Sequence, residues 1–82
     1  MMPLTAVQQG QNVQILNLPH NQALQKRLAS MGIRPGSKVQ VLRRGLPGGI
    51  LHVASGVLEF MIRHDHAHEI EVSLDNVSQV QA

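Results

Sequence analysis

The chain has 82 residues, of which 43% are hydrophobic, and seven Lys or Arg against five Asp or Glu give it a formal net charge of +2. This length predicts a single domain over residues 1–82, with one core and no room for a deep cleft between lobes. The sequence contains no cysteine, which excludes a disulfide scaffold and a thiolate metal site. Phe60 is the one residue among Phe, Tyr and Trp, so we expect an otherwise aliphatic core that includes it.

Nothing in the sequence suggests a membrane segment. The apolar stretch 50–62 is interrupted by His52, Gly56 and Glu59, and it falls short of the roughly 18 to 20 unbroken apolar residues that a spanning helix needs. Residues 1–5, Met-Met-Pro-Leu-Thr, lack the basic and apolar regions of a signal peptide. We therefore expect a soluble, cytoplasmic protein without membrane insertion.

A period of two dominates the hydrophobic pattern, and this is the spacing of a half-buried β-strand. The first alternating run carries Val13 and Ile15 on one face, and Ser55-Gly56 separates two later runs as a hairpin link. Five short strands cannot bury the face of a flat sheet, so we expect them to close into a small barrel. The runs are 12–18, 38–44, 50–54, 57–62 and 70–73.

Residues 21–31 depart from this period and predict the one helix of the chain. Leu24, Leu28 and Met31 recur at i, i+4 and i+7, which is the stripe of an amphipathic helix. We expect this stripe to face the barrel. Asn21 is placed to be the N-cap of the helix.

The end of the helix carries its own stop signal. Gly32 is placed to adopt the left-handed conformation, and Ile33 to close a Schellman motif. The next four residues, 34–37, read Arg-Pro-Gly-Ser. Pro at the second position and Gly at the third are typical of a type II turn.

Two segments resemble landmarks of a known family. Residues 28–36, Leu-Ala-Ser-Met-Gly-Ile-Arg-Pro-Gly, and residues 62–70, Ile-Arg-His-Asp-His-Ala-His-Glu-Ile, are similar in order and separation to motifs of the FeoA family, ferrous iron transport protein A. The resemblance covers nearly the whole chain. It implies a mainly β fold, an SH3-like small β-barrel of about five strands with one inserted short α-helix.

The resemblance also implies a function. It indicates a small cytosolic accessory protein that supports or regulates ferrous iron uptake by binding FeoB, the membrane transporter. A helix laid on a barrel leaves a groove beside it, where small barrels hold peptide partners. We expect the helix margin and the glycine-rich loop 45–49 to contact FeoB. The candidate partner-binding residues are Leu24, Lys26, Arg27, Met31 and Leu46.

Three histidines form the one cluster with metal-ligand chemistry. In an extended segment His64, His66 and His68 share a face, whereas in a helical turn only the first and the last do. Both geometries stay open. Because imidazole suits several divalent metals, the alternative function is a metal sensor or buffer that binds Fe²⁺, Zn²⁺ or Ni²⁺ weakly. A solvated turn is the simpler interpretation.

The remaining classes of function are disfavoured. Lys38, Arg43, Arg44 and Arg63 could form a basic patch, but binders of single-stranded nucleic acid add stacking aromatic residues, and the one aromatic residue of this chain, Phe60, is expected in the core. We read these cations as a solvated strand edge and expect no nucleic acid partner. No serine or histidine has the context of a catalytic motif, so we expect no enzyme and no required cofactor. A homo-oligomer stays open, and the last residues of the tail are expected to fray.

Overall fold

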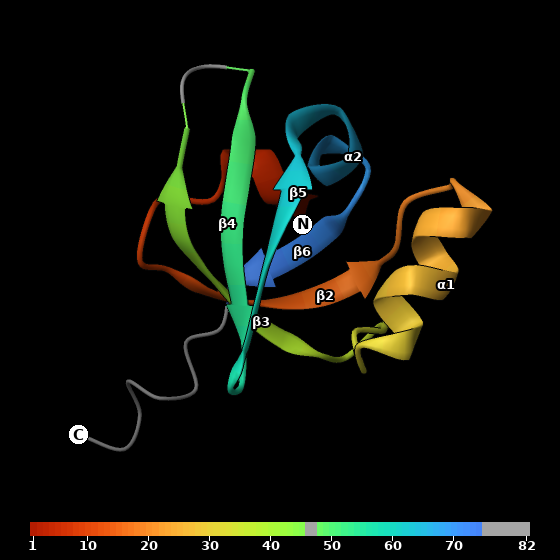
Figure 1. Ribbon diagram of the computed structural model, residues 1–82. Helices are drawn as coiled ribbons and strands as arrows, with labels where there is room; N and C mark the ends of the chain where they lie inside the picture. Colours follow the sequence, from red (N-terminus) through yellow and green to blue (C-terminus); the bar gives the residue numbers. More distant parts are fainter. Residues whose placement is uncertain (46–47, 75–82) are drawn as a thin grey trace.

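A computed structural model describes residues 1–45 and 48–74 of the chain. It is mainly β, as predicted, with strands that curl around one core and helices at the margins (Figure 1). In chain order the elements are β1 (Met2–Pro3), the 3₁₀ helix η1 (Leu4–Ala6), β2 (Asn12–Asn17), α1 (Gln22–Ser30), β3 (Lys38–Arg44), β4 (Ile50–Ser55), β5 (Leu58–Arg63), α2 (His64–His68) and β6 (Glu71–Leu74).

The strands form one antiparallel sheet in the order β1-β6-β2-β3-β4-β5. The five predicted strands are all present, and β1 is a sixth that the sequence pattern does not reveal. With two residues, β1 is too short to show a period, and it forms only because Met2 and Pro3 pair with Val72 and Glu71 of β6. The two edges of the sheet in the described residues are β1 and β5.

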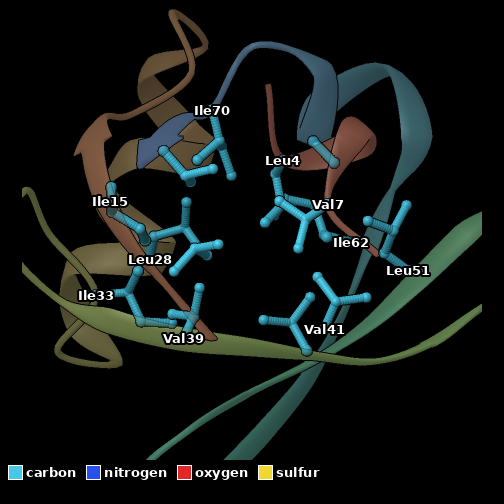
Figure 2. Close-up of a cluster of buried hydrophobic side chains, with 14 residues drawn as sticks. Leu4, Val7, Ile15, Leu28, Ile33, Val39, Val41, Leu51, Ile62 and Ile70 are labelled. Carbon is cyan, nitrogen blue, oxygen red and sulfur yellow. The ribbon is translucent and has the colours of Figure 1, made fainter. Parts of the chain in front are cut away.

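The core is aliphatic, as the composition requires (Figure 2). Burial of each such side chain stabilises the fold by about 1.5 to 3 kcal/mol relative to its exposure to water. Phe60 is half-buried and packs against this core from its margin, so the expectation that it lies inside holds only in part. The buried residues are Leu4, Val7, Val13, Ile15, Leu28, Ile33, Val39, Val41, Leu51, Val53, Ile62, Ala67, Ile70 and Val72.

Capping interactions at both ends determine where α1 begins and ends. The side chain of Asn21 accepts a hydrogen bond from the Leu24 N–H at 2.9 Å, which confirms it as the N-cap. At the other end the N–H of Ile33 donates to the carbonyl of Leu28 at 2.9 Å, and Gly32 has a φ of +83°. These are the features of the predicted Schellman closure.

The predicted turn after α1 is also present. The N–H of Ser37 donates to the carbonyl of Arg34 at 2.9 Å, and Gly36 has a φ of +97°. Because this positive φ falls at the third turn position, the turn is type II. It directs the chain from the helix into β3, so that α1 lies against the outside of the barrel (Figure 1).

The N-terminal segment contributes side chains to the core. Leu4 and Val7 are fully buried, and the N–H of Leu4 donates to the carbonyl of Ile70 at 2.8 Å. Figure 2 shows both side chains pointing into the core between the strands. Leu4 and Val7 are therefore part of the core, although the sequence around them shows no strand or helix period.

A β-bulge at Leu42 changes which way the end of β3 faces. Val41 pairs with Val53, whereas Arg43 pairs with His52 and Arg44 with Leu51, so Leu42 is an extra residue in β3. Directly paired residues share a face of the sheet. Arg44 is therefore on the face of buried Leu51, and its guanidinium donates to the carbonyl oxygens of Thr5 and Val7. Arg44 is exposed as predicted, but β3 lies between β2 and β4, so the prediction that this cation stands on a strand edge is wrong.

Candidate partner-binding groove

A groove lies between α1 and the edge strand β5, and its volume is about 110 Å³. On one side it is lined by α1 and its C-cap, with Leu24, Arg27, Leu28 and Met31. On the other side it is lined by β5 and the middle of α2, with Phe60, Met61, Ile62, Arg63 and His66. Its floor is apolar because Leu28 and Ile62 belong to the core, while Leu24, Met31 and Phe60 are half-buried against it.

Three of the residues predicted to bind a partner line the groove. Leu24, Arg27 and Met31 line it, as the expectation of a groove beside the helix requires. Lys26 is exposed on α1 and does not line this groove. Leu46 lies outside the described residues.

The contribution of β5 was not predicted. The alternating pattern of β5 shows that Phe60 and Ile62 face inward. It does not show that α1, which is distant in sequence, lies beside them. The hairpin predicted from Ser55-Gly56, whose two turn residues are Gly56 and Val57 in the structure, was one usable signal, because it makes β5 the last strand of a meander and so a candidate sheet edge.

The rim of the groove is cationic. Arg27 is exposed on α1, and Arg63 stands across from it with its side chain 76% exposed. The Nε of Arg63 is 3.9 Å from a carboxylate oxygen of Asp65, a loose pairing between two exposed side chains. His66 adds an imidazole, and no Asp or Glu is among the described residues that line the groove.

The three clustered histidines lie on a helix. Because α2 spans His64–His68, the helical geometry holds and not the extended one. The rings of His64 and His68 stack with centroids 6.4 Å apart and an interplanar angle of 12°, whereas His66 lines the groove. In residues 1–45 and 48–74 no group of three or more His, Cys, Asp or Glu is placed to hold a metal ion.

His68 is also tied to the N-terminal segment. Its Nδ1 lies 3.3 Å from the hydroxyl oxygen of Thr5, which is the one buried polar residue in the described part of the chain. This contact leaves Nε2 of His68 available, so the His64 and His68 pair can offer two nitrogen ligands from one face of a helix. Two ligands alone do not complete the coordination shell of a divalent metal ion.

Within the part of the chain that the structure describes, no helix is long and apolar enough to cross a membrane.

The fold and the groove together define a small SH3-like β-barrel with a helix at its margin. A family model for the FeoA domain matches residues 2–74, so the chain belongs to the FeoA family. A comparison with curated proteins gives no match.

Solved structures agree with this assignment. An iron uptake regulatory protein (FeoA) is 27% identical with a TM-score of 0.76, and the match covers 90% of this chain and 96% of that one. The FeoA protein from Chlorobium tepidum is 25% identical with a TM-score of 0.83, covering 89% and 70%. Stenotrophomonas maltophilia FeoA, described as a procaryotic SH3 domain protein complexed with zinc, is 23% identical with a TM-score of 0.75, covering 89% and 91%. The family is thereby linked to ferrous iron transport.

Proposed function

We propose that this protein is a non-catalytic cytoplasmic accessory of ferrous iron uptake that binds the cytosolic part of the FeoB transporter. The observation that carries the proposal is the groove between α1 and β5, which has an apolar floor and a cationic rim. Apolar grooves with a few polar groups at the rim are common sites for peptide and protein partners. Membership of the FeoA family supports iron transport as the setting.

Co-purification of FeoB from native membranes, with and without Fe²⁺, tests the proposal. We expect the wild-type chain to retain FeoB and Arg27→Glu to retain much less, because the substitution reverses a charge on the rim. Arg34→Glu is the matched control, since Arg34 is also exposed but lies outside the groove. If FeoB is never retained, the proposal is wrong. If both variants retain it as the wild type does, the groove is not the binding surface.

A second candidate function is favoured by the stacked pair of His64 and His68. Two imidazoles one helical turn apart on one face would supply two nitrogen ligands, which suits weak binding of Fe²⁺, Zn²⁺ or Ni²⁺. The zinc in the description of the Stenotrophomonas maltophilia protein is consistent with metal binding on this fold. Replacement of both histidines by alanine separates the two functions: an accessory protein keeps FeoB binding, whereas a metal sensor or buffer loses its function.

A further inference from the structure

We propose that the groove receives an extended, acidic peptide segment of the partner, which adds as a strand to the outer edge of β5 and inserts one aliphatic side chain between β5 and α1. The inference rests on the proposed partner-binding function. It goes further by naming the conformation of the bound segment and its chemistry.

The first observation is the open edge of β5. In the described residues β5 pairs with β4 on one side and with no strand on the other. The strand is six residues long and contains no proline, so every N–H in it is a donor. An exposed strand edge of this kind is a template for the addition of another extended segment.

The hairpin turn decides which backbone groups point outward. Gly56 has a φ of +63° and is the first of two turn residues, which identifies a type II′ turn. Such a turn joins Ser55 and Leu58 as a mutually bonded pair, and bonded and non-bonded pairs then alternate along the ladder. The N–H groups of Glu59 and Met61 therefore point away from β4, toward the open edge.

The second observation is that this edge borders the groove. Met61 lines it together with its inward-facing neighbours Phe60 and Ile62, and the facing wall is α1. A segment that pairs with β5 therefore runs between the strand and the helix, with alternate side chains directed into the groove. An apolar cavity of about 150 Å³ holds benzene, so the 110 Å³ found here suits an aliphatic side chain better than an aromatic ring.

The third observation is the sign of the charge at the rim. Arg27 and Arg63 stand on opposite walls, and no acidic side chain among the described residues lines the groove between them. Asp65 approaches Arg63 only loosely, at 3.9 Å. A bound segment with Asp or Glu on both sides of its aliphatic residue complements both arginines.

Amide exchange measured by NMR on the full chain tests the inference. The probe is the synthetic peptide acetyl-Glu-Asp-Val-Leu-Val-Asp-Glu-amide. We expect new protection from exchange at the amides of Glu59 and Met61, and little change at Leu58 and Phe60, which already bond to β4. The same peptide with Lys and Arg in place of its acids, or with Asn in place of Leu, is expected to bind at least about tenfold more weakly.

Variants of the chain complete the test. Arg27→Glu is expected to weaken binding of the acidic peptide by about tenfold, which corresponds to about 1.4 kcal/mol, whereas Arg34→Glu leaves it unchanged. The inference is overturned if the peptide causes no change at about 1 mM, if it shifts resonances outside the groove, or if it binds without protecting Glu59 and Met61. Concentration-dependent dimerisation that protects the same two amides assigns the edge to a second copy of the chain and also overturns it.

The FeoB experiment separates this inference from the proposed function. If FeoB is retained but the peptide does not add to β5, only this inference is wrong. If the peptide adds to β5 but FeoB is not retained, FeoB is not the partner, and the proposed mode of binding is still supported.

Discussion

The guanidinium of Arg44 donates a hydrogen bond to the backbone carbonyl of Thr5, with Nη2 2.5 Å from the oxygen. Its Nη1 donates to the carbonyl of Val7 at 3.3 Å. Through these two bonds the end of β3 holds the N-terminal segment, whose Leu4 and Val7 fill the core. Arg44 thus donates hydrogen bonds to two backbone carbonyls that have no partner within the β-sheet.

Arg44→Ala is expected to lower the free energy of unfolding by roughly 1 to 3 kcal/mol, because it removes a charged donor from two backbone acceptors. Urea denaturation followed by circular dichroism measures the change. Arg43→Ala is the control, since Arg43 lies on the opposite face of the sheet and is expected to change stability by less than about 0.5 kcal/mol. Equal losses in the two variants contradict the role given to Arg44.

The direction of the Arg44 side chain could not be predicted from the sequence. Strict alternation from Val39 and Val41 places Arg43 inside and Arg44 outside, and the bulge at Leu42 reverses this. A bulge depends on how two strands pair, and residues 38–44 contain no glycine or proline to announce it. The direction of a side chain after a bulge is therefore a tertiary property.

Structural features that depend on residues close together in the sequence could be predicted. Both ends of α1 and the turn at 34–37 followed from the sequence because their hydrogen bonds join residues within five positions of each other. The groove could be predicted only on its α1 side. Its β5 side depends on β5 being the edge of a six-stranded sheet, and the position of His66 depends on α2, a five-residue helix with Ala67 as its one buried residue.

Gly32 offers a test of the closure of α1. Gly32→Ala is expected to cost about 1 to 2 kcal/mol, because the φ of +83° strains any residue with a Cβ. Gly32→Asn is expected to cost less, since Asn tolerates the left-handed region better than Ala. Apart from its two chain neighbours, no described residue places an atom within 4 Å of a Cβ at this position, so a steric clash is not a competing cause. Thermal unfolding of both variants checks the order, and a larger loss for Asn contradicts it.

Two leucines on α1 separate core packing from groove lining. Leu28→Ala is expected to cost roughly 2 to 5 kcal/mol, because Leu28 is 1% exposed and its removal leaves a cavity. Leu24→Ala is expected to cost less, since Leu24 is half-buried at the edge of the core. Guanidinium denaturation measures both changes. A loss for Leu24→Ala as large as that for Leu28→Ala places Leu24 in the core, against the structure.

The three histidines of α2 are expected to respond differently to a divalent metal. His64 and His68 are one helical turn apart with stacked rings, whereas His66 lines the groove. His64→Ala or His68→Ala is therefore expected to weaken Ni²⁺ and Zn²⁺ binding at least about tenfold, because one ligand cannot chelate. Titration calorimetry measures the affinities, with Fe²⁺ added under anaerobic conditions. His66→Ala is the matched control and is expected to bind as the wild type does. An equal loss in His66→Ala argues against the pair as the ligands, and a wild-type chain that releases no heat with any of the three metals rules out the site.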